Sequence, residues 1–176
     1  GKTFRWADGD YRLQVAPHTP PILGRVEAWL NPANAQLSLD IAGLLGSSEL
    51  TEIDYSLLNA DGVVLLTLDG LETRTARVDV NVDDNLNPPQ FFGQVDLSID
   101  SEFSRETLEQ AQFVRVGVRD EFGGRSDGQD TFFAPARPLD SGQACNPADA
   151  RAICPAEHAC YDRNPNQGQE TRCQIY

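Results

Sequence analysis

Apolar and polar residues alternate along short stretches through most of the chain, and this pattern restricts the fold more than any other feature. Leu37, Leu39 and Ile41 alternate with polar residues, and Val114 and Val116 do the same further along. A period of two residues predicts a β-strand with one face buried and the other in water. We therefore expect an all-β fold.

We predict about eight strands separated by turn residues, which is typical of β-sandwiches. Their ranges are 25–30, 37–41, 53–57, 63–68, 78–82, 95–99, 112–119 and 131–133. Residues 104–110 form the one stretch expected to be helical, with Ser104 as its N-cap. Because long helices do not alternate with the strands, we expect two antiparallel sheets packed face to face, and not a parallel sheet.

The clearest predicted hairpin has its turn at residues 59–62, where the sequence is Asn-Ala-Asp-Gly. The strand after it, 63–68, is apolar on both faces. Leu66 and Leu68 share one face, and Leu65 belongs to the other. A strand of this kind is expected in the centre of a sheet, where both faces are covered.

A tight turn follows the strand at 112–119 and contains the pattern D-x-x-G-x-x-S, formed by Asp120, Gly123 and Ser126. Strand and turn together resemble the penultimate strand and following turn of fibronectin type III and other immunoglobulin-like modules in bacterial secreted proteins. The resemblance covers residues 20–138. It implies an immunoglobulin-like, antiparallel two-sheet β-sandwich in a protein of the bacterial cell surface.

All four cysteines, Cys145, Cys154, Cys160 and Cys173, lie near the C-terminus. Such clustering predicts a small disulfide-stapled tail and an oxidising compartment. Of three possible pairings we favour Cys145 with Cys160 and Cys154 with Cys173, because interleaved bridges constrain a segment too small for its own core. A zinc site would need two cysteines in close pairs such as C-x2-C, and no such pair occurs in the sequence. The single His158 does not supply the missing ligands. The spacing also resembles short cysteine-rich segments that follow β-domains in bacterial secreted and surface proteins.

The chain is strongly acidic, with 27 acidic and 14 basic residues and a formal net charge of −13. It should repel nucleic-acid phosphates and anionic lipids, so we expect no nucleic-acid partner. No run of about 18 apolar residues occurs, so no membrane insertion is expected. Because the sequence has no Met and residues 1–16 lack an apolar leader, we expect a chain whose leader has been removed.

Prolines in the stretch 17–21 separate an N-terminal arm from the strands. We predict an arm and connector at residues 1–19, a β-sandwich domain at 20–138 and a cysteine-rich tail at 139–176. The arm carries alternating large apolar residues, namely Phe4, Trp6, Tyr11 and Leu13. An arm that left its own domain could add a strand to the open sheet edge of a neighbouring copy, with these residues as anchors.

Acidic residues gather at two predicted strand ends, at residues 79–85 and around the glycine-rich turn. Carboxylates on such loops can hold Ca²⁺ when six or more oxygens converge. We therefore take Asp120, Asp127 and Asp130 as a candidate calcium site and expect no other cofactor. The alternative is that these residues only form turns and solvated strand faces.

The sequence has no H-E-x-x-H motif and no P-loop, and it has only two histidines, His18 and His158. We expect a non-catalytic extracellular adhesion or binding module whose partners are proteins or glycans at the cell surface, or copies of itself. One alternative is a structural subunit of an extracellular filament, assembled through the arm. A second alternative is an extracellular hydrolase that uses a pair of carboxylates.

Overall fold

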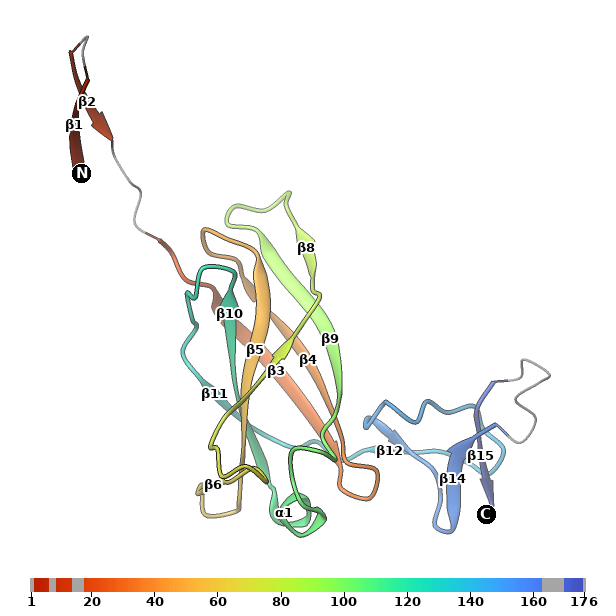
Figure 1. Cartoon of the computed structure of the whole chain (residues 1–176). Helices are drawn as coiled ribbons and strands as arrows, with labels where there is room; N and C mark the ends of the chain where they lie inside the picture. Colours follow the sequence, from red (N-terminus) through yellow and green to blue (C-terminus); the bar gives the residue numbers. More distant parts are fainter. Residues whose placement is uncertain (1, 7–8, 14–17, 163–169, 176) are drawn as a thin grey trace.

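The computed structural model describes residues 2–6, 9–13, 18–162 and 170–175 of the chain. Residues 18–134, which we call the β-domain, contain two antiparallel sheets. The described residues from 135 onward form a smaller unit beside one end of the sheets, which we call the tail (Figure 1). None of the described residues forms a helix with the length and apolar content needed to cross a lipid bilayer.

The first sheet has the strand order β3-β4-β9-β8. Its strands are β3 (Ile22–Asn31), β4 (Gln36–Leu44), β8 (Asn81–Asp83) and β9 (Gln90–Ser98). The second sheet has the order β11-β10-β5-β6, and β7 also pairs with β5. Its strands are β5 (Leu50–Leu58), β6 (Val64–Leu65), β7 (Arg74–Arg77), β10 (Phe113–Asp120) and β11 (Gln129–Phe132).

One hydrophobic core lies between the two sheets. The first sheet contributes Leu37, Leu39 and Ile41 from β4, and the second contributes Val114 and Val116 from β10; each is at most 1% exposed. The alternation read from the sequence is therefore confirmed in these strands. The transfer of each of these side chains from water into the core stabilises the fold by about 1.5–3 kcal/mol.

The predicted helix is also present, as α1 (Arg105–Gln110). Ser104 is its N-cap, and its Oγ accepts a hydrogen bond from the backbone N–H of Thr107 at 3.2 Å. Leu108 is 1% exposed and ties the helix to the core. With six residues the helix is too short to be stable alone, so this packing maintains it.

The prediction of a central strand at 63–68 is wrong. Only β6 pairs in the sheet, and it lies at an edge of the second sheet. The chain leaves the sheet at Leu66 because Thr67 closes a turn with Leu71: each backbone N–H bonds to an oxygen of the other residue at 2.9 Å. Leu66 and Leu68 are therefore 53% and 60% exposed, where the sequence predicted burial.

The predicted strand at 78–82 is divided between the two sheets. The backbone N–H of Val78 donates to the carbonyl of Thr51, a residue of β5 in the second sheet, at 3.0 Å. Three residues later Asn81 begins β8, which pairs with β9 of the first sheet. The segment thus crosses from one sheet to the other, and its alternating valines face the gap between them only in part.

Two short strands precede the β-domain, β1 (Lys2–Trp6) and β2 (Gly9–Leu13). They pair antiparallel as a hairpin, with Phe4 opposite Tyr11. The hairpin stands apart from both sheets in Figure 1.

The tail has short strands of its own. They are β12 (Arg137–Pro138), β13 (Ala152–Ile153), β14 (His158–Tyr161) and β15 (Arg172–Ile175). β12 pairs with β13 in parallel, and β14 pairs antiparallel with β15. The backbone N–H of Cys145 also bonds to the carbonyl of Thr171, which brings the start of the cysteine-rich segment alongside β15.

Candidate functional site

Two disulfides hold the tail together, Cys145–Cys160 and Cys154–Cys173. This is the pairing that we favoured from the sequence. Cys160 and Cys173 lie opposite each other on β14 and β15, yet each is bonded to an earlier cysteine. The bridges therefore fasten this hairpin to the segment between Cys145 and Cys154. Disulfides of this kind indicate an oxidising compartment.

The sulfur atoms of Cys145, Cys154 and Cys173 lie within 4.8 Å of one another, a separation that a metal ion could bridge. All three sulfurs belong to disulfides, so they offer no thiolate to a metal. Their proximity means that the two bridges pack against each other. The cluster is a small covalent core in a unit that has few buried apolar side chains.

The tail covers part of the outer face of the first sheet. Ser38 on β4 lies on the polar side of the strand, yet it is 0% exposed. The backbone N–H of Ala150 donates to Ser38 Oγ at 2.8 Å, and Ser38 Oγ donates to Asp96 Oδ1 at 2.7 Å. Ser38 points outward, as the alternation predicts, but the tail covers it, so this part of the outer face is not in water.

Arg151 holds the tail to the sheet. Its Nη1 donates to Asp40 Oδ1 at 2.9 Å, and its guanidinium carbon lies 5.7 Å from the centre of the Trp29 ring, within the range of a cation–π contact. Its Nε and Nη2 also donate to both carboxylate oxygens of Asp149, at 3.0 and 3.1 Å. The planar guanidinium can make all these contacts at once, which a lysine could not do.

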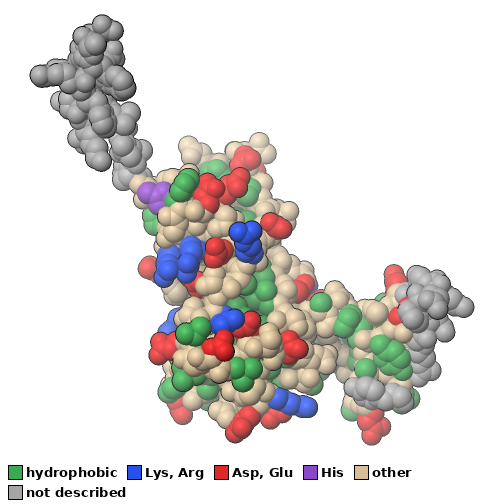
Figure 2. All heavy atoms as spheres, in the orientation of Figure 1, with side chains coloured by type: hydrophobic (Ala, Val, Ile, Leu, Met, Phe, Trp, Pro, Cys, Tyr) green, Lys and Arg blue, Asp and Glu red, His purple; other side chains and the backbone are tan. Residues whose placement is uncertain are grey.

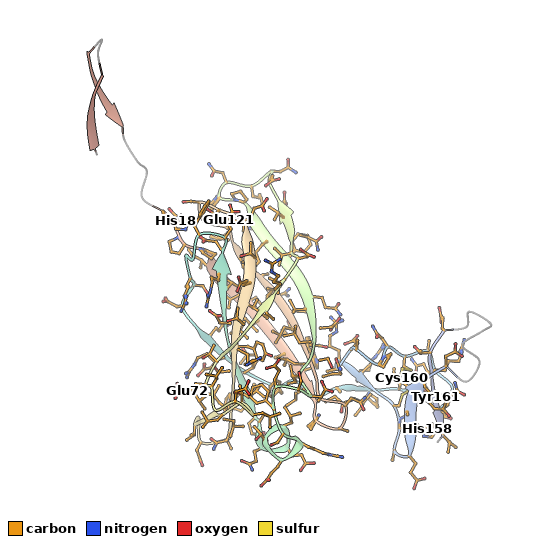
Figure 3. The ribbon with its side chains drawn as sticks, in the orientation of Figure 1. His18, Glu72, Glu121, His158, Cys160 and Tyr161 are labelled. Atoms are coloured by element: carbon orange, nitrogen blue, oxygen red, sulfur yellow. A yellow bond between two sulfur atoms is a disulfide. The ribbon has the colours of Figure 1, made fainter. Side chains whose placement is uncertain are left out.

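A cavity of about 460 Å³ lies between the β3–β4 turn and the docked tail, and we call it the cleft. Its polar lining residues are Asn31, Asn34, Gln36, Asn146, Asp149 and His158. His158 and Cys160 line it from the tail (Figure 3). The cleft exists because the tail is docked, since each unit contributes one of its walls.

Asparagine side chains give the cleft neutral hydrogen-bonding groups. Asn31 Oδ1 accepts hydrogen bonds from the backbone N–H groups of Ala33 and Asn34, at 3.2 and 3.4 Å. Asn146 Oδ1 accepts one from the N–H of Ala148 at 3.0 Å. These turns use the amide oxygens, so within the described part of the chain the amide N–H groups remain available to a ligand.

The charged groups of the cleft are already paired. Asp149 is bonded to Arg151 through both oxygens. His158 Nδ1 lies 2.8 Å from the carbonyl of Ala156, which can only accept, so this nitrogen carries the proton. Its Nε2 lies 3.0 Å from Ser141 Oγ. The cleft is therefore suited to a neutral polar ligand more than to an ion.

Asp120 contacts His18. Figure 3 shows His18 and the neighbouring Glu121 at the end of the β-domain opposite the tail. Its Oδ1 accepts from the backbone N–H groups of Phe122 and Gly124 at 2.9 and 2.8 Å, and its Oδ2 lies 2.6 Å from His18 Nε2. Burial raises the pKa of Asp120, but the hydrogen bonds from Gly124, His18 and Phe122 outweigh it and leave the pKa below its ordinary value. A Cβ at Gly124 would lie 2.5 Å from Asp120 Oδ2, so this position requires glycine.

The candidate calcium ligands do not come together. Asp130 lies on β11 and accepts two hydrogen bonds from Arg115, at 2.6 and 3.0 Å, which hold its pKa below the ordinary value. Asp120 faces inward as the cap of its turn, and Asp127 is exposed. No three acidic side chains among the described residues have oxygens close enough to share an ion. The predicted convergence is therefore not found.

The proposed arm anchors belong to the hairpin, with Phe4 and Trp6 on β1 and Tyr11 and Leu13 on β2. Their backbone is described, and their side chains lie outside the description. Arg151 was missed in the sequence, although no other Lys or Arg occurs between Cys145 and Cys160. A lone base within a stapled, acidic chain could have marked it as a docking residue.

Comparisons with protein families, with curated proteins and with solved structures find no match to this chain. Its function is therefore inferred from its residues and their geometry.

Replacing Arg151 with Gln should loosen the tail from the sheet, because the bonds to Asp40 and the contact with Trp29 are lost. Hydrogen bonds to charged groups contribute about 1.5–3 kcal/mol, so exchange of the buried Ala150 amide should accelerate about tenfold or more. Hydrogen exchange followed by mass spectrometry or NMR measures this. Arg172→Gln is the control, since the side chain of Arg172 bonds to the Gly142 carbonyl within the tail. Equal protection of Ala150 in both variants would show that Arg151 does not dock the tail.

Asp120→Asn should destabilise the β-domain at neutral pH by about 1–3 kcal/mol, because the turn and His18 lose a charged acceptor. The folded-state pKa of Asp120 is depressed, so its contribution is complete above the unfolded-state value of about 4 and is lost as pH falls through the lower folded value. The unfolding free energies of the two proteins should converge below that range. Denaturant titrations from pH 7 to pH 2.5 test this, and a constant difference across the range would contradict it.

Proposed function

We propose that this chain is an extracellular, non-catalytic binding module built on an immunoglobulin-like two-sheet β-sandwich. The strand order supports this fold. With β3, β4, β5, β8, β9, β10 and β11 taken as strands A to G, the sheets have the orders A-B-E-D and C-F-G of immunoglobulin-like domains. β6 and β7 then lie beside strand C, where variable members of this architecture add strands.

An extracellular location is supported by two observations. The two disulfides would be reduced in a glutathione-buffered cytosol. The net charge of −13 keeps such a chain soluble and away from anionic surfaces. The proposals of a bacterial source and of attachment to the cell envelope rest only on resemblance: the Asp120 turn and the cysteine spacing are similar to those of bacterial secreted and surface proteins.

The cleft between the β3–β4 turn and the tail is the single observation that carries the binding function. A cavity of about 460 Å³ is large enough for a small ligand. Its amide N–H groups are donors, so they favour a ligand that carries neutral hydrogen-bond acceptors. Hydroxyl and acetamido oxygens of a neutral glycan are acceptors of this kind. We propose that the cleft binds a neutral glycan. A peptide is the alternative ligand, because its carbonyl groups are acceptors of the same kind.

The alternative of a hydrolase is less well supported. Among the described residues that line the cleft, Asp149 is the single carboxylate, and both its oxygens are bonded to Arg151. Glycoside hydrolysis needs two carboxyl groups that flank one bond. A non-catalytic role is therefore the better proposal.

Asparagine variants that keep the turns test the binding proposal. Asn31→Asp with Asn146→Asp retains the acceptor oxygen of each turn but removes the amide donors from the cleft. We expect a bound neutral glycan, identified by array screening of the wild-type chain, to lose affinity about tenfold or more. Asn59→Asp is the control, because Asn59 caps a turn in the same way, with bonds at 2.9 and 3.0 Å, and lies away from the cleft. Equal losses in both variants, or binding only to peptides, would reject the glycan.

A filament subunit is the second candidate function, and the hairpin β1–β2 favours it. The hairpin stands apart from the sheets, so the outer edges of both strands could pair with another chain (Figure 1). Sedimentation over a hundredfold range of concentration should then give a rising mass for the whole chain but not for a chain that begins at His18. A constant monomer mass for both would remove this candidate.

A further inference from the structure

Four large aliphatic side chains are exposed within nine residues that follow the β5–β6 turn. They are Val63 (58%), Leu66 (53%), Leu68 (60%) and Leu71 (49%), and we call them the leucine surface. Single exposed apolar residues are common on proteins, but a cluster of this kind marks an interaction site. These residues lie around and directly after β6, which is away from the tail in Figure 1.

The exposure of the leucine surface is held by hydrogen bonds. Thr67 is 6% exposed and receives an N–H from both Gly70 and Leu71, while its own N–H donates to the Leu71 carbonyl. The N–H of Leu68 donates to the carbonyl of Glu102 at 2.8 Å. Because the backbone is fixed on both sides of Leu68, the leucines cannot turn into the core, and they are presented in a preformed arrangement.

Acidic residues border this surface. Asp61 precedes it, and Asp69 and Glu72 lie within it or directly after it. The basic residue Arg74 is already paired with Asp69, at 3.6 Å, and with Glu102. Figure 2 shows hydrophobic and acidic side chains at this end of the domain, with some basic side chains between them, and Figure 3 shows Glu72 on the β6 side.

We propose that the leucine surface binds a protein partner that presents apolar side chains flanked by Lys or Arg. Burial of the leucines supplies the affinity, and the acidic border selects basic flanks. A second copy of this chain would bring the same acidic border against itself, and the repulsion disfavours that occupant. The surface is separate from the cleft, so the chain can hold both ligands.

A synthetic 12-residue peptide of alternating Leu and Lys is the probe. Its binding to the full chain is followed by fluorescence anisotropy, beside a Leu-Glu peptide and a Ser-Lys peptide of the same length. The Leu-Lys peptide should bind, the Leu-Glu peptide should not, and the Ser-Lys peptide should bind at least tenfold more weakly. Failure of the Leu-Lys peptide to bind would overturn the proposal.

The double variant Leu66→Ser with Leu68→Ser should bind the Leu-Lys peptide at least tenfold more weakly than the wild type. Its melting temperature should stay close to that of the wild type, because both side chains are exposed. Leu71→Ser alone is the second variant, for use if the double variant unfolds. The matched control is Val82→Ser with Leu86→Ser, since these residues are 41% and 42% exposed and also lie among acidic residues. An equal loss in the control would show that the peptide binds exposed apolar side chains without preference for the leucine surface, and self-association that depends on Leu66 and Leu68 would show a second copy; either result would overturn the proposal.

Discussion

The burial of alternating apolar faces between two sheets is the constraint on which the rest of the molecule depends. Each strand of the core has one face of side chains that are excluded from water, as Leu37 and Leu39 are on β4 and Val114 and Val116 on β10. Once these faces are paired, the opposite faces and the loops are fixed in space. The cleft, the Asp120 turn and the leucine surface are all built on positions that this core determines.

β4 illustrates how one strand serves two purposes. Its inner residues fill the core, while its outer residues Ser38 and Asp40 bind the tail through Ala150 and Arg151. The tail is too small to be stabilised by an apolar core, so two disulfides hold its shape and a set of polar contacts holds its position. The two units together form a cleft that neither forms alone, and the binding proposal depends on that pairing.

The proposed glycan cleft and the leucine surface differ in chemistry and therefore in the partners they suit. The cleft offers neutral donors from asparagines whose oxygens are used in turns. The leucine surface offers exposed aliphatic side chains, and the acids Asp61 and Glu72 flank it in the sequence. A binding module with two surfaces could connect a glycan to a protein, which is compatible with a role outside the cell.

The sequence alone determined the secondary structure of most of the core and the N-cap at Ser104, and its clustered cysteines indicated an oxidising compartment, because period-two burial, capping and cysteine clustering are local properties. It also indicated the disulfide pairing. It did not determine that residues 66–71 leave the sheet, that 78–82 cross between sheets, or that Ser38 is covered. Those outcomes depend on which strand occupies an edge and where the tail docks, and Arg151 meets Asp40 across 111 positions of the chain. Only the tertiary structure brings such residues together, because a hydrogen bond between distant segments leaves no periodic signal in either one.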